Sequence, residues 1–137
     1  MINHLFELII MENIHIKRSP STPDKPEVRF NAETGVCEII GESYMESTYT
    51  FFLPLMNWLT QYINEVGKGI EFHVKLFYFN TSATKCLLDI LEILKKYEND
   101  GGKVTVKWYY DEEDPDVEDE VKDFEIESGL DIQLVKM

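Results

Sequence analysis

The chain has 137 residues, 44% of them hydrophobic and 28% charged; this favours one globular domain and excludes two domains or disorder of the whole chain. Its 26 acidic and 13 basic residues give a formal net charge of −13. Because nucleic-acid binding depends on Lys and Arg neutralising phosphates, this balance excludes a nucleic-acid partner and favours a protein partner with a basic surface.

The cysteines and the start of the chain bear on its compartment. Cys37 and Cys86 form no CxxC pair, so a zinc site is not indicated, and two thiols in a well-cored chain favour a reducing, cytoplasmic compartment. No stretch approaches the ~20 apolar residues of a membrane span. Residues 1–10 lack a basic n-region and a cleavage site, so no signal peptide is predicted. Met11 is an alternative site for the start of translation. If translation starts at Met1 instead, residues 1–10 are expected to form an extra strand.

The first part of the chain is predicted as an N-terminal extension, residues 1–26, that is extended or poorly ordered. Residues 17–26 hold three of the five prolines. A single domain is expected over residues 27–137. It opens with a β-hairpin, because Val28 and Phe30 alternate in the first strand and a second strand follows the turn at residues 31–35.

A helix and a central strand come next. Apolar residues recur at helical spacing from Phe52 to Val66, and glycines follow. Pro54 must lie in the first turn of this helix or kink it. Residues 70–79 begin by alternating and end fully apolar, which is typical of a strand in the middle of a sheet.

The second half alternates helices and strands. Residues 80–82 are typical helix-capping residues, and an apolar stripe over 83–94 predicts a helix that ends before Gly101. A strand is predicted over 104–110, a third helix from Pro115 to Gly129, and a last strand over 130–135.

This order of elements predicts an α/β fold. Strand–helix–strand units favour parallel pairing with right-handed crossovers. On the 104–110 strand, Thr105 and Lys107 make one face polar, which indicates that helices cover mainly the other face. We therefore expect a four- or five-stranded mixed sheet with helices mainly on one face. Tyr109 is expected on the open face, where it could contribute to a docking surface.

The junction at residues 80–84 is the main candidate site, because it lies between a central strand and a helix N-terminus. Free N–H groups and the helix dipole favour negative charge there. A phosphate on Thr81 or Ser82 would be tolerated, with about 0.3–1 kcal/mol from the dipole. The alternative is that these residues only cap the helix, and the residues alone favour capping.

Other residues give weaker signals. The acidic run Asp111–Asp123 lacks the spacing and glycine of an EF-hand, which favours a solvated loop and helix start over a calcium site. His4, His15 and His73 are scattered, although a small metal-assisted enzyme that uses His73 with carboxylates from 111–120 is an alternative function. Cys86 fits a core hydrophobe. The absence of a Gly-rich phosphate loop predicts no cofactor.

Four motifs in this sequence are similar to the SiaC family of bacterial regulatory phosphoproteins. They are Ser21–Pro23, Gly41–Ser47, Tyr78–Ser82 and Trp108–Tyr110. The resemblance covers residue 21 to the end. It departs from the family at Met45, where proline is frequent.

The chain also resembles STAS domains, the anti-sigma-factor antagonists, more distantly. STAS domains carry a phosphorylatable hydroxyl at the start of the helix that follows a central strand, the place of Thr81 and Ser82 here. Asn80 stands where STAS domains usually have aspartate. This similarity implies a STAS-like fold and an alternative function as an anti-sigma-factor antagonist.

The SiaC resemblance implies a partner-switching regulator with no catalytic activity of its own. A protein kinase would phosphorylate the threonine that matches Thr81, and a PP2C-type phosphatase would remove the phosphate. The unphosphorylated form would bind and activate a diguanylate cyclase, which raises cyclic-di-GMP and promotes biofilm formation or aggregation. Asn80, Ser82, Thr84 and Lys85 would flank the switch, with Ser82 and Thr84 as alternative phosphoacceptors.

Overall fold

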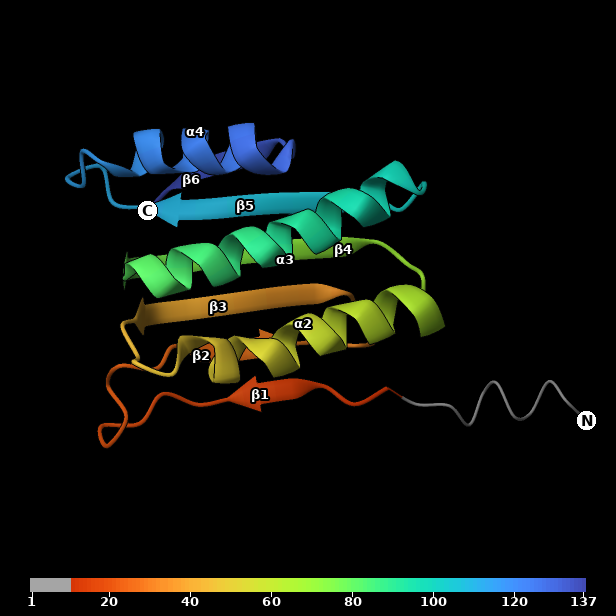
Figure 1. The fold of residues 1–137 in the computed structure, drawn as a ribbon, viewed down its shortest axis with the longest axis horizontal. Helices are drawn as coiled ribbons and strands as arrows, with labels where there is room; N and C mark the ends of the chain where they lie inside the picture. Colours follow the sequence, from red (N-terminus) through yellow and green to blue (C-terminus); the bar gives the residue numbers. More distant parts are fainter. Residues whose placement is uncertain (1–10) are drawn as a thin grey trace, which may run out of the picture.

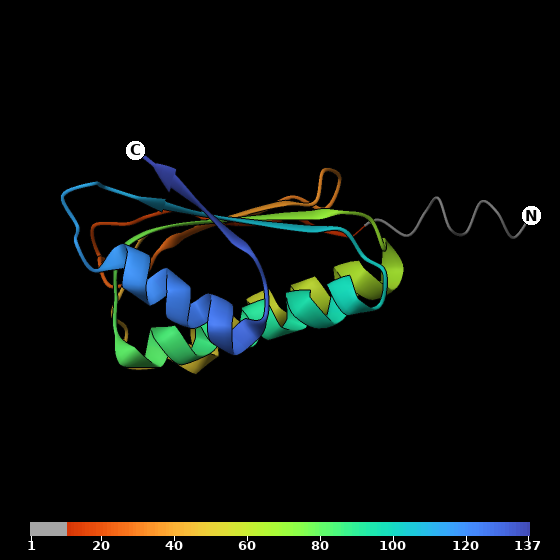
Figure 2. The same cartoon turned by 90° about the horizontal axis from the view of Figure 1, so that it is seen from above.

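The protein is a two-layer α/β structure in which a sheet carries its helices on one face (Figures 1 and 2). The computed structural model describes residues 11–137, so the predictions for residues 1–10 and His4 lie outside the described residues. The strands are β1 (Ile14–Ile16), β2 (Glu27–Phe30), β3 (Val36–Ser43), β4 (Ile70–Phe79), β5 (Val104–Tyr110) and β6 (Ile132–Lys136). The helices are α2 (Thr48–Glu65), α3 (Thr81–Asn99) and α4 (Val117–Ser128).

The strands lie in the sheet in the same order as in the chain. β1, β2 and β3 pair antiparallel, and β3 to β6 pair parallel, with a helix in each crossover. The predicted α/β fold with a mixed sheet and helices mainly on one face is therefore confirmed. The sheet has six strands rather than four or five. The additional strand is β1, where Ile14 pairs with Phe30 and Ile16 pairs with Val28.

The core lies between the helices and the inner face of the sheet. Alternate side chains of the central strands point inward, so that Ile39 and Phe72 are fully buried. The predicted apolar stripes of α2 and α3 cover them. Fully buried helix residues include Phe52, Leu55, Leu59, Leu87, Ile90 and Leu94. The sequence periodicity therefore identified the inward faces of both helices.

Helix α2 begins earlier than its apolar stripe indicated. It begins at Thr48, so Pro54 lies inside the helix rather than in its first turn. Proline has no N–H, and the carbonyl of Thr50 therefore lacks its usual intrahelical donor. Thr50 is exposed, so water can satisfy that carbonyl.

A binding site could form at the end of the sheet where the parallel strands have their carboxyl ends. The carboxyl ends of β3, β4 and β5 lie at the left of Figure 1, together with the amino ends of α2, α3 and α4. In open α/β sheets, this edge is where ligands and partners are commonly bound. The junction between β4 and α3, which includes Thr81, lies at this edge.

Candidate functional site

The predicted switch residues lie together on one turn at the start of α3. Thr81 is the first residue of the helix and is exposed, as are Ser82, Thr84 and Lys85. Asn80 is half-buried against the end of β3. Thr81 is therefore accessible from solvent without unfolding of the helix.

Asn80 caps α3. Its side-chain Oδ1 accepts a hydrogen bond from the Ala83 N–H at 2.9 Å, and its Nδ2 donates to the Met45 carbonyl at 3.2 Å. Its backbone N–H donates to the Ser43 carbonyl at 3.0 Å. Of the predicted capping residues 80–82, Asn80 is therefore the one that caps the helix, and its amide both satisfies the helix N-terminus and holds the loop after β3. Thr81 is not needed for capping.

This division of roles predicts different effects on stability for neighbouring residues. Replacing Asn80 with alanine removes the cap and one loop contact, so we expect a loss of about 1–2 kcal/mol in the free energy of unfolding. Thr81→Ala is expected to stay within about 0.5 kcal/mol of wild type, as an exposed substitution. Urea denaturation of both variants checks this. A larger loss for Thr81→Ala than for Asn80→Ala would contradict the assignment of the cap.

Met45 anchors Asn80 through its backbone. Its side chain is buried, and its backbone carbonyl accepts hydrogen bonds from Thr48 Oγ1 at 2.8 Å and from the Asn80 amide. The polar role at this position therefore belongs to the backbone carbonyl rather than to the side chain.

Exposed aromatic side chains lie beside this junction. The pairing of β3 and β4 shifts after Gly41, so Phe77 has no partner on β3. This irregularity leaves Phe77 56% and Tyr78 54% exposed, where strict alternation would turn one of them inward. Tyr44 packs edge-on against Tyr78, with ring centroids 6.1 Å apart. We call Tyr44, Phe77 and Tyr78 the aromatic surface; exposed aromatic side chains are candidates for contact with a partner protein.

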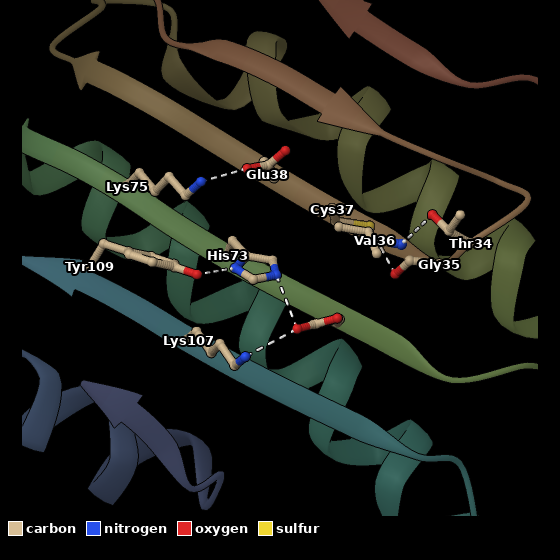
Figure 3. Close-up of polar contacts among 10 residues, drawn as sticks. Thr34, Gly35, Val36, Cys37, Glu38, His73, Lys75, Lys107 and Tyr109 are labelled. Atoms are coloured by element: carbon tan, nitrogen blue, oxygen red, sulfur yellow. Dashed lines mark hydrogen bonds and ion pairs between the residues drawn. The ribbon is translucent and has the colours of Figure 1, made fainter. Parts of the chain in front are cut away.

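The open face of the sheet carries a polar cluster around His73 (Figure 3). His73 Nδ1 lies 2.8 Å from the Tyr109 hydroxyl, and Nε2 lies 3.3 Å from a Glu71 carboxylate oxygen. Lys107 pairs with the same carboxylate at 3.3 Å. Lys75 Nζ lies 4.8 Å from the centre of the Tyr109 ring. Tyr109 is thus on the open face, as predicted, but half-buried within this cluster.

The cluster does not match the enzyme alternative. The carboxylates that act on His73 are those of Glu71 and Glu38, which lie outside residues 111–120. Among residues 11–137, no group of three or more His, Cys, Asp and Glu residues is placed to hold a metal ion. The convergence of His73 with the acidic segment that this alternative requires is therefore not formed.

His73 predicts a pH dependence of stability. Burial lowers the pKa of His73 below its ordinary value of 6.5, although Glu71 acts in the opposite direction. The folded chain therefore binds fewer protons at His73 than the unfolded chain does, and its contribution to stability is lost as the pH falls. From about pH 7.5 to about pH 5, wild type should lose more stability than His73→Gln, measured by urea denaturation at each pH. His15→Gln, at an exposed position, is the control and should follow wild type.

The two thiols are buried in the core. Burial raises the pKa of Cys37 and of Cys86, so both favour the protonated form. Cys86 is 4% exposed, in agreement with its predicted role as a core hydrophobe. In the part of the chain that the structure describes, no helix is both long and apolar enough to cross a membrane.

Comparisons with known proteins converge on one family. The family described as "SiaC family regulatory phosphoprotein" matches residues 19–137. An uncharacterised protein of Pseudomonas aeruginosa (strain UCBPP-PA14) is 28% identical over 114 residues, which are 83% of this chain and 88% of that protein. The resemblance drawn from the four sequence motifs is confirmed.

Solved structures agree with this match. The crystal structure of apo-SiaC from Pseudomonas aeruginosa has a TM-score of 0.81 at 26% identity, covering 90% of this chain and 98% of that chain. SiaC in complex with the diguanylate cyclase SiaD, for which it is the activator, has a TM-score of 0.83 at 23% identity. That match covers 90% of this chain and 99% of that chain, and it shows a shared fold.

Proposed function

Because this chain belongs to the SiaC family of regulatory phosphoproteins, we propose that it is a phosphorylation-switched activator of a diguanylate cyclase. The observation that carries this proposal is the position of Thr81, exposed on the first turn of α3 beside the aromatic surface. SiaC of Pseudomonas aeruginosa is the activator in a complex with the cyclase SiaD. That relative favours a cyclase over an anti-sigma factor as the partner.

A phosphate on Thr81 would act at an interface rather than on the fold. At the helix N-terminus it would gain about 0.3–1 kcal/mol from the dipole, and Lys85 lies one turn further along on the same face. The phosphate would add a charge of about −1.5 to −2. When a partner docks on the aromatic surface, the phosphate would have to be desolvated. Desolvation of a charge costs free energy unless a cation of the partner pairs with it. Unphosphorylated chain is therefore the binding form.

The switch requires two further partners. We propose that a protein kinase adds the phosphate to Thr81 and that a PP2C-type phosphatase removes it. The regulator itself has no catalytic activity, and binding of the unphosphorylated chain raises cyclic-di-GMP and so promotes biofilm formation or aggregation. All of this would take place in the cytoplasm, where the two buried thiols stay reduced.

The decisive experiment combines an activity assay with mass spectrometry. Purified chain is added to the purified diguanylate cyclase of its own organism, and cyclic-di-GMP production from GTP is followed. Chain isolated from cells is then digested, and any phosphate is mapped among Thr81, Ser82 and Thr84. We expect activation by the unphosphorylated chain and a phosphate on Thr81. If the unphosphorylated chain does not activate the cyclase, the proposal is refuted. If the phosphate is found only on Ser82 or Thr84, the phosphorylation site is that residue and not Thr81.

A further inference from the structure

A cleft of about 280 Å³ lies between α3 and α4, close to the proposed switch. Its apolar lining comes from Phe79, Leu88 and Phe124. Thr84 also lines it, and Thr84 lies one helical turn from Thr81. The cleft is large enough for one long side chain, but it is smaller than the usual range of small-molecule sites, about 300–1,000 Å³.

The remaining lining of the cleft is acidic. Glu120, Asp123 and Glu127 stand on α4 at spacings of three and four residues, so one face of the helix presents all three carboxylates. Every charged residue in the lining is acidic. A cavity with aromatic walls and three carboxylates is complementary to a cation that has a flat, apolar face.

The stability of α4 does not account for these carboxylates. Acidic residues in the first turn of a helix gain from its dipole, which applies to Glu120. Asp123 lies beyond the first turn, and Glu127 is in the last turn, where the dipole disfavours negative charge. The last turn of α4 carries no basic residue to offset Glu127.

Glu120 also lowers the stability of the fold in its ionised form. Burial raises the pKa of Glu120, and the neighbouring Asp114 and Asp116 raise it further. Ionised Glu120 therefore destabilises the folded chain at neutral pH relative to a neutral side chain. A charged group that lowers the stability of the fold is typical of a binding site.

We propose that the cleft between α3 and α4 receives an arginine side chain of the cyclase, an inference that rests on the proposed function. The guanidinium group is planar, so its flat face can lie against the apolar wall formed by Phe79 and Leu88 while its N–H groups pair with Glu120 and Asp123. Lysine offers a point charge and lacks the flat face. The net charge of −13 steers a basic partner segment toward this chain.

The test uses two variants that lose the same three negative charges. The cleft variant is Glu120→Gln with Asp123→Asn and Glu127→Gln. The control is Glu33→Gln with Glu65→Gln and Asp100→Asn, at exposed positions that lie at the opposite end of the sheet. Affinity for the purified cyclase is measured by isothermal titration calorimetry. The cleft variant should bind at least about tenfold more weakly than wild type, whereas the control should stay close to wild type.

A second measurement addresses the cleft without the cyclase. N-acetyl-arginine amide is titrated into the chain and followed by NMR, with N-acetyl-citrulline amide as the uncharged counterpart. We expect shift changes at residues 84–88 and 120–127 in wild type, and none there in the cleft variant.

The outcomes separate the cleft from the proposed function. Equal loss of cyclase affinity in both variants would show an effect of net charge alone and overturn the proposal for the cleft. Wild-type affinity in the cleft variant would overturn it as well, while leaving the cyclase as partner. If wild type itself does not bind the cyclase, the proposed function fails, and the arginine titration then decides whether the cleft binds guanidinium.

Discussion

Replacing Thr81 with glutamate is expected to weaken binding to the diguanylate cyclase by about tenfold or more, which corresponds to at least ~1.4 kcal/mol. The glutamate places a fixed negative charge on the exposed first turn of α3, beside the aromatic surface. Docking would have to remove water from that charge, and a real phosphate, with about −1.5 to −2 charge, should have a larger effect. Thr81→Ala should keep wild-type affinity and escape the kinase. Calorimetric titration against the cyclase measures both.

The control for this prediction is Ser82→Glu. Ser82 is also exposed on the first turn, but it points about 100° further around the helix. Ser82→Glu adds the same charge as Thr81→Glu and gains the same stabilisation from the helix dipole. Both variants should therefore have a melting temperature at or above that of wild type. A weaker effect of Ser82→Glu shows that the position of the charge matters. Wild-type affinity for Thr81→Glu would count directly against a switch at Thr81.

Replacing Trp108 with alanine should produce the largest loss of stability, about 3–5 kcal/mol. Trp108 is 1% exposed, stacks on Phe124 with ring centroids 5.0 Å apart, and meets Phe79 at 5.8 Å. These three rings join β5 and β4 to α4. Since small domains have a total stability of about 5–15 kcal/mol, much of the folded population could be lost. The free energy of unfolding in urea gives the value.

Tyr109→Ala is the matched control for Trp108→Ala. Tyr109 is the next residue on β5 and points to the open face of the sheet, where it contacts His73. Its removal leaves no enclosed cavity, so we expect a smaller loss than for Trp108. Equal losses for the two variants would mean that the open face stabilises the fold as much as the core does.

The main elements of the fold could be predicted because their signals are local. The predicted hairpin strands within residues 27–41 and the helical stripe over 83–94 each lie within one segment, and both are confirmed. β1 was missed because its three residues, Ile14–Ile16, are too few to give a strand signal, and its formation depends on pairing with β2. The start of α2 at Thr48 was missed for a similar reason, since its first turn precedes the apolar stripe.

The site was predictable only in part. The position of Thr81 could be predicted, because the sequence clearly indicates a junction between a strand and a helix at this residue. The choice of Asn80 as the cap depends on its contact with the Met45 carbonyl, 35 residues away in the chain. The irregular pairing that exposes both Phe77 and Tyr78 is a property of two paired strands. Likewise, the cleft joins Thr84 and Leu88 to residues of α4, and no local pattern connects those two segments.

The strand order has a consequence for how the chain reaches its fold. Each strand pairs with its neighbours in the chain, so no pairing has to wait for a distant segment. The entropy of loop closure is therefore incurred one connection at a time, and each connection holds no more than a single helix. Such a topology has a low contact order for a mainly parallel sheet, and low contact order favours rapid folding. The sheet can grow from β2 and β3 outward, so the turn with Thr81 takes its place once β4 pairs with β3.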